Sequence, residues 1–116
     1  PYTFVLESTT DAEKLMRCSK SGTVGVRIPS HPVMLLLLSE LKLPVLNVSL
    51  LVSKEEEDDE DRVVSEIELI DTSLAAQVDL IIDSGYCDPE GTTIIDLTSA
   101  KAVVLREGKG AVDAFL

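Results

Sequence analysis

Tryptophan is absent from this sequence, and aromatic residues make up only 3% of its 116 residues. Because 45% of the residues are nevertheless hydrophobic, we expect an aliphatic core. The single histidine, His31, excludes a His-rich metal site. The longest apolar run covers residues 33–38, which is far too short to cross a bilayer, so no membrane span is expected.

Cysteine is also scarce. Cys18 and Cys87 lie far apart and form no C-x-x-C pair, which excludes a disulfide framework and a zinc ribbon. We predict two reduced thiols in an intracellular protein, either cytoplasmic or organellar. No signal peptide is recognised. Because Pro1 opens directly onto an alternating apolar run, we expect further residues upstream of it, or a partner chain that supplies them.

Positive charge is in short supply, with 10 basic against 21 acidic residues and a formal net charge of −11. Seven acidic residues form one unbroken run at positions 55–61, and without that run the charge is −11 + 7 = −4. Runs of like charge repel one another and stay solvated, so residues 54–61 are expected to be an acidic surface insertion. The overall sign disfavours non-specific nucleic-acid binding and leaves room only for a small basic groove.

The pattern of apolar residues predicts strands that alternate with helices. A helix over residues 11–16 is expected to be capped by Thr10 or Asp11, and a second, deeply buried helix over residues 31–41 to be capped by Ser30. Residues 62–76 are compatible with one or two helical pieces. Strands are predicted at residues 2–6, 23–28, 45–51, 78–83, 92–97 and 102–105. This order indicates a single α/β domain with a mixed sheet.

Two strand ends carry candidate binding residues. Arg27 ends one strand just before a helix starts, where a guanidinium and helix N–H groups suit a phosphate or carboxylate; the alternative is a surface arginine paired with an acid. Asn47 and Ser49 share one face of the strand predicted at 45–51. Their partners are either a ligand or backbone groups.

A third candidate group combines Thr92 and Thr93 with Arg106 on the next strand, where hydroxyls beside an arginine can hold an oxyanion. A simple ion pair between Arg106 and Glu107 is the alternative. His31 is expected to have a structural or phosphate-facing role, and no catalytic triad is recognised. Together the three groups predict an anion or nucleotide pocket without an obvious general base.

Four motifs, in order, resemble the YrdC-type domain family, whose members make threonylcarbamoyl-adenylate for tRNA modification. Residues 1–6 resemble its Pro-x-x-Thr-x-x-Leu strand, and residues 23–32 its Thr-Val-Gly-Val-Arg-x-Pro-x-His-Pro signature. Residues 91–96 resemble its Pro-Ser-Thr-Val-Val-Asp segment, and residues 104–110 its closing Leu-Arg-x-Gly-x-Gly. Through residues 47–51 and 78–86 the YciO-type branch resembles this chain most. The whole chain is similar to the C-terminal portion of one such domain.

The resemblance implies a fold and a chemistry. The implied fold is that of YrdC and DHBP synthase, an α/β twisted open mixed sheet with flanking helices and a concave groove that has been linked to double-stranded RNA. The family joins L-threonine, bicarbonate and ATP with Mg²⁺, without a tightly bound metal. Thr23, Ser49 and Arg106 would contact the nucleotide. Arg27, Asn47 and Thr92 would form the region that holds threonine and its carboxylate.

The chain also departs from the family pattern. The N-terminal half, with its Lys-x-Arg phosphate clamp, has no counterpart here, and Leu51 replaces a family asparagine. Three functions therefore stay open: an L-threonylcarbamoyladenylate synthase-like domain, a non-catalytic subunit of a larger assembly, and a module that binds tRNA or double-stranded RNA. A partner chain, or an N-terminal half-domain, would cover the sheet in the first two cases.

Overall fold

The computed structural model describes residues 1–16, 22–52, 62–70 and 72–116. They form two units, one made of Pro1–Leu46 with Gly91–Leu116 and the other of Asn47–Glu90. The acidic insertion and Cys18 lie outside the described residues, whereas Cys87 is a free thiol, as predicted. None of the helices in the described ranges is long and apolar enough to span a membrane.

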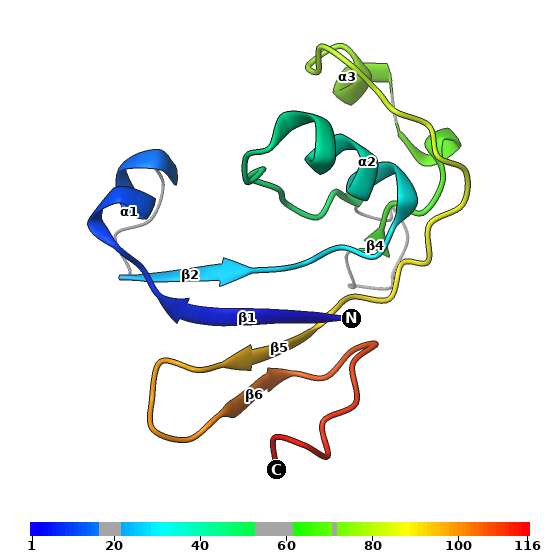
Figure 1. Ribbon diagram of the computed structural model, residues 1–116. Coiled ribbons are helices and arrows are strands. Elements are labelled where there is room, and N and C mark those ends of the chain that lie inside the picture. The colour runs from blue at the N-terminus through cyan, green and yellow to red at the C-terminus, as the bar shows by residue number, and fades with distance from the viewer. Residues whose placement is uncertain (17–21, 53–61, 71) are drawn as a thin grey trace. The chain divides into compact units, whose positions relative to one another are not determined.

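The first unit is built on a four-stranded mixed sheet in the order β2-β1-β5-β6 (Figure 1). Its strands are β1 (Tyr2–Glu7), β2 (Thr23–Val26), β5 (Thr93–Asp96) and β6 (Val103–Arg106). β1 pairs parallel with β5, and the two outer pairs are antiparallel. The predicted mixed α/β sheet is confirmed.

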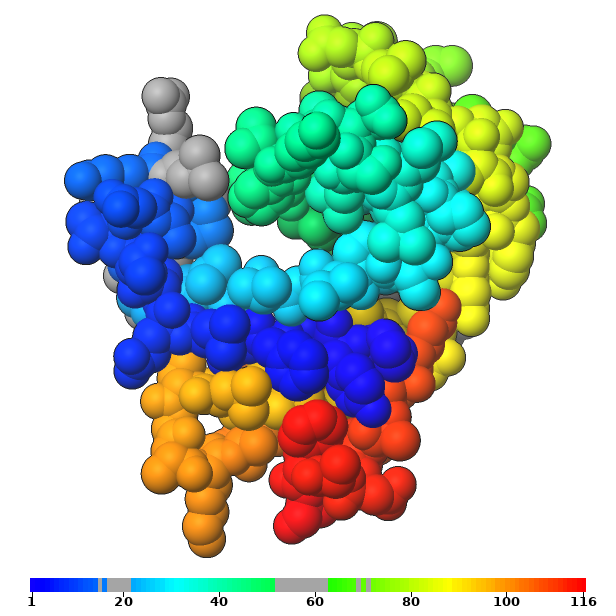
Figure 2. All heavy atoms as spheres, in the orientation of Figure 1, coloured from blue at the N-terminus to red at the C-terminus, as the bar shows by residue number. Residues whose placement is uncertain are grey.

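The two faces of this sheet differ in chemistry. Tyr2 and Phe4 of β1 stand opposite Thr93 and Ile95 of β5 and form what we call the aromatic face. Phe115 packs on it, with ring centroids 5.7 Å from Tyr2 and 6.3 Å from Phe4, and Figure 2 shows the C-terminal segment in red against β1 in blue. Ile95 and Thr93 are fully buried there, so the core is small.

The other face carries hydroxyls, and we call it the threonine face. Because side chains alternate along a strand, Thr3 and Val5 project opposite to Tyr2 and Phe4. The register places Thr23 beside Glu7 and Ile94 beside Thr3 on this same face. A Cβ on Gly25 would lie 3.5 Å from the Thr3 methyl group, which puts that position on the threonine face as well.

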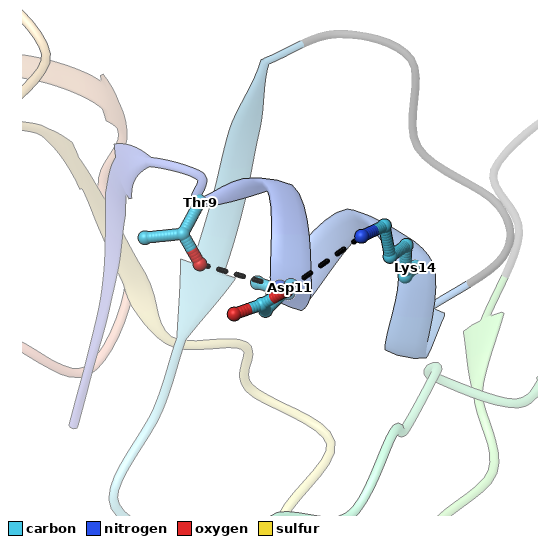
Figure 3. Close-up of polar contacts among 4 residues, drawn as sticks. Thr9, Asp11 and Lys14 are labelled. Carbon is cyan, nitrogen blue, oxygen red and sulfur yellow. Dashed lines mark hydrogen bonds and ion pairs between the residues drawn. The ribbon is translucent and has the colours of Figure 1, made fainter.

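Helix α1 (Thr10–Met16) follows β1 and begins one residue earlier than predicted. Thr9 caps it, since the Thr9 hydroxyl accepts the Ala12 N–H at 3.2 Å (Figure 3), so the predicted cap at Thr10 or Asp11 is wrong. Lys14 pairs with Asp11 at 3.9 Å on the exposed surface. An exposed pair of this kind contributes little to stability.

Helix α2 (Pro32–Leu41) starts with Pro32 in its first turn, as expected. Its N-cap residue is His31, not Ser30, and the His31 side chain makes no capping hydrogen bond. Lys42 ends the helix in the left-handed region (φ 53°), where its N–H donates to the Leu38 carbonyl at 2.9 Å. The predicted deep burial is wrong: no α2 residue is buried, because the described residues do not surround this leucine-rich helix on every side.

The second unit has little regular structure. It contains β3 (Leu51–Val52) paired antiparallel with β4 (Arg62–Val63), the 3-10 helix η1 (Ile67–Leu69) and α3 (Thr72–Ala75). Residues 62–76, for which the sequence allowed one or two helical pieces, therefore contain two short ones after β4. The strands predicted at residues 45–51 and 78–83 are wrong apart from Leu51, because a strand needs a hydrogen-bonded neighbour along its length. The Leu50 carbonyl still accepts the Val64 N–H at 3.0 Å, but no described strand pairs with the rest.

Candidate functional site

Candidate site residues gather at one end of the sheet in the first unit. Thr92 immediately precedes β5, Arg106 is the last residue of β6, and Arg27 immediately follows β2. Since β2 and β6 run antiparallel to β1 and β5, these three positions share the end of the sheet where β1 and β5 begin, which we call the arginine end. The sequence showed only that the three residues belong to separate strands. The strand order and directions bring them to the same end of the sheet.

A pair of hydroxyls lies at the centre of this end. The Thr3 Oγ1 and Thr92 Oγ1 atoms are 2.7 Å apart, and Thr92 is only 8% exposed. One hydroxyl donates to the other, which leaves one O–H hydrogen and several lone pairs for a further partner. Sequence reasoning missed Thr3. Its signal was the alternation of residues 2–6, which places Thr3 opposite the aromatic side chains.

Arg106 is oriented by the backbone beside this pair. Its Nε and Nη2 donate to the Thr92 carbonyl at 3.2 and 2.8 Å, and its Cα partner Ile94 lies on the threonine face. A guanidinium has five N–H donors, so three remain for an anion. An ion pair between Arg106 and Glu107 was the alternative prediction, and it is wrong.

Arg27 is exposed and has no hydrogen-bond or ion-pair partner among the described residues. Arg27 lies two positions after Gly25, and side chains two positions apart on a strand project on the same side, so the Arg27 side chain projects on the threonine face. The alternative prediction, a surface arginine paired with an acid, is not what these residues show. Helix α2 begins at Pro32, shortly beyond Arg27.

Thr23 belongs to the same face but to the other end of β2, where it pairs with Glu7. It lies four positions from Arg27, which is roughly 13 Å along an extended chain. A ligand that touches both would have to extend along β2. Thr23 is half-buried, and β2 is an edge strand that pairs with β1 in the described sheet.

Asn47 and Ser49 lie in the second unit, both exposed, and neither is in a strand. The argument that they share one strand face is therefore wrong. Their contact with a ligand stays a prediction that rests on the family resemblance.

Asp96 ends β5 at the far end from Thr92. Hydrogen bonds from the Thr98 hydroxyl (2.7 Å) and the Thr98 N–H (2.8 Å) lower the pKa of Asp96 below the ordinary value for an aspartate. A carboxylate of lowered pKa is a weaker base. The hydrogen bonds from Thr98 make Asp96 part of the turn after β5. Since Asp96 also lies at the other end of the strand, it is not placed to act as a general base at the arginine end.

The donors at the arginine end indicate what the site can hold. Hydroxyls and guanidinium groups bind anionic oxygen, and they are poor ligands for Mg²⁺, which prefers carboxylates, phosphates and water. No group of three or more His, Cys, Asp or Glu side chains able to hold a metal occurs in the described ranges.

The Sua5/YciO/YrdC family model, described as telomere recombination, matches residues 1–108. The chain belongs to this family. It is 41% identical over 115 residues to an uncharacterized protein of Haemophilus influenzae and to the uncharacterized protein YciO of Escherichia coli strain K12. These matches cover 99% of this chain but only 54% and 53% of the two relatives.

A solved structure agrees with the sequence relatives. The crystal structure of E. coli YciO superimposes with a TM-score of 0.82 at 41% identity, covering 99% of this chain and 53% of that one. The family and the YciO-like fold are thus confirmed. The chain spans about half the length of the curated relatives it matches.

Proposed function

We propose that this member of the Sua5/YciO/YrdC family is the C-terminal portion of one YrdC-like domain, and that it binds a nucleotide and threonine in a reaction related to threonylcarbamoyl-adenylate synthesis. The observation that carries the proposal is the arginine end of the threonine face. Arg27 and Arg106 have no carboxylate partner in the described ranges, although the chain has 21 acidic and 10 basic residues. Two unneutralised guanidinium groups beside a hydroxyl pair suit an external anion.

The proposed roles follow from position. Arg106, held on the Thr92 carbonyl, would present its remaining N–H groups to phosphate oxygens of MgATP. The exposed Arg27 would bind the threonine carboxylate, and the Thr3–Thr92 pair would bind its polar groups. These residues would position the two substrates and neutralise the phosphate and carboxylate charges, which is what an adenylyl transfer mainly requires. None of them serves as a nucleophile. A phosphate clamp and the remaining sheet would come from an N-terminal half or a partner chain.

Calorimetric titration of the purified protein with L-threonine and with MgATP tests the roles. Arg27→Ala removes a charged hydrogen bond of about 1.5–3 kcal/mol, so the Kd for threonine should rise about 10- to 100-fold. Lys101→Ala, which removes an exposed cation from the β5–β6 turn at the other end of the sheet, is the matched control and should change little. If both Arg27→Ala and Lys101→Ala lost affinity for threonine, the effect would come from the net charge of the protein and not from a binding site.

Turnover is a separate question. Pyrophosphate release from ATP with threonine, bicarbonate and Mg²⁺ would support the synthase-like activity, and it should fall in Arg106→Ala. Binding without release would support a ligand-binding domain that has lost the reaction. No binding of either ligand, by the chain alone or together with an added N-terminal half-domain, would refute the proposal.

A non-catalytic subunit is the second candidate, favoured by exposed apolar side chains in both units. Ile28 is 84% exposed, Val48 91% and Leu80 75%. Such surfaces are liabilities unless a partner covers them. Light scattering distinguishes this candidate: a cooperatively folded monomer would remove the need for a partner. RNA binding stays a prediction, to be tested by a salt-dependent affinity that Arg27→Ala abolishes.

A further inference from the structure

One buried hydroxyl fastens the turn that follows β6. Thr93 is fully buried, and its Oγ1 donates to the Gly110 carbonyl at 2.6 Å while accepting the N–H groups of Gly108 (3.0 Å) and Gly110 (2.9 Å). A threonine hydroxyl has one donor and two acceptor lone pairs. All of this capacity is therefore used by the turn at residues 107–110.

The turn lies directly against the segment that precedes β5. The Lys109 N–H donates to the Gly91 carbonyl at 3.0 Å. A Cβ on Gly108 would meet the backbone of Gly91 and Thr92, and a Cβ on Gly110 would meet the Tyr2 ring. Glycine at both positions lets the turn approach this closely.

Arg106 is the residue immediately before this turn. Its backbone is held on one side by pairing with Ile94, and on the other by the turn that Thr93 fastens. Its guanidinium bonds the carbonyl of Thr92, the residue that precedes Thr93. Thr93 itself is opposite Tyr2 on the aromatic face and is 0% exposed, so it cannot touch a ligand on the threonine face.

We infer that Thr93 is a positioning residue for Arg106: its hydroxyl sets the turn that aims the guanidinium at an anionic ligand on the opposite face of the sheet. The ligand in this inference is the nucleotide phosphate of the proposed function, on which it rests. The positioning of Arg106 can be measured without any ligand.

Two variants separate the hydroxyl from the packing. Thr93→Val keeps the shape and leaves two N–H groups and one carbonyl of the turn without their partner, whereas Thr93→Ser keeps the hydroxyl. We expect Thr93→Val to accelerate hydrogen exchange at Arg106 Nε, measured by NMR, and to raise the Kd for MgATP about tenfold. Thr93→Ser should restore both close to the wild-type values.

An Arg106→Ala background distinguishes positioning from general stability. If Thr93 acts through Arg106, Thr93→Val should still lower Tm in that background but should weaken MgATP binding no further. An equal loss of affinity in both backgrounds, or unchanged exchange at Arg106 Nε, overturns the inference. If Thr93→Val does not fold, Thr93→Cys, which keeps a weak donor of similar size, takes its place with the same expected directions.

The failure of the proposed function is recognised separately. If the wild-type protein, together with any partner half, binds neither MgATP nor pyrophosphate, the proposed function fails. The Arg106 Nε exchange rates of wild type, Thr93→Val and Thr93→Ser then decide the positioning role by themselves.

Discussion

The closest backbone approach in the site predicts a large cost for one added methyl group. An ideal Cβ at Gly108 would lie 2.8 Å from the Thr92 carbonyl carbon and 2.9 Å from its oxygen, and nearer still to the Gly91 oxygen. These neighbours are backbone atoms and cannot rotate away. Gly108 has no positive φ, so the cost of Gly108→Ala is steric and not conformational.

The magnitude follows from what must move. Separating the turn from residues 91–92 breaks the bond from Lys109 N–H to the Gly91 carbonyl and disturbs the Thr92 carbonyl on which Arg106 rests. Overpacking costs about 1–3 kcal/mol and a lost hydrogen bond about 1 kcal/mol. We expect Gly108→Ala to lower the free energy of unfolding by about 2–4 kcal/mol.

Gly25→Ala is the matched control, because its Cβ would lie at an ordinary 3.5 Å from the Thr3 methyl group. Alanine is the better residue within a strand, so Gly25→Ala should be neutral or stabilising by up to about 1 kcal/mol. Urea unfolding followed by circular dichroism compares the two variants. If Gly108→Ala cost no more than Gly25→Ala, the close packing of the turn on residues 91–92 would be wrong.

Three further predictions concern the core, one turn and one helix end. Ile95→Ala should destabilise by about 3 kcal/mol in urea unfolding, since Ile95 is fully buried, whereas Ile28→Ala, at an 84% exposed residue, should stay within about 0.5 kcal/mol. Because the pKa of Asp96 is lowered in the folded state, its carboxylate stabilises the fold above the ordinary aspartate pKa, and this contribution is lost as pH falls through the folded pKa. Urea unfolding measured from pH 7 downward should therefore show that Thr98→Val destabilises the protein near pH 7 and that the difference disappears in acid. A difference that does not change with pH would contradict this prediction. Lys42→Gly should raise Tm, because glycine relieves about 1 kcal/mol of left-handed strain at φ 53° and this gain exceeds the entropy that glycine adds to the unfolded chain. Lys42→Ala does not relieve the strain and should not raise Tm.

Local patterns were sufficient for most of the first unit. Strands β1, β2, β5 and β6 and both helices lie within two residues of their predicted bounds. Alternation and punctuation by Gly22, Pro29 and Pro32 act over a few residues, so the chain specifies these elements locally. The family was also recognisable from its four motifs.

The second unit shows where local patterns fail. Residues 45–49 and 78–83 have strand-like composition, yet no described strand pairs with them and they are exposed. Composition records a preference for a pleated, half-buried surface and says nothing of whether a neighbour is present to provide it. The same reason removed the shared strand face proposed for Asn47 and Ser49.

The linear order of residues was enough to establish the kind of fold and the family, and to predict anion binding by Arg27 and Arg106, because each depends on residue type and short-range spacing. Pairing across the chain decided the site. Thr3 and Thr92, 89 residues apart, share a hydrogen bond because β1 and β5 run in parallel. Thr93 supports Arg106 from the opposite face because a turn folds back onto β5. Contacts of that range arise from strand order and register, which no local pattern encodes.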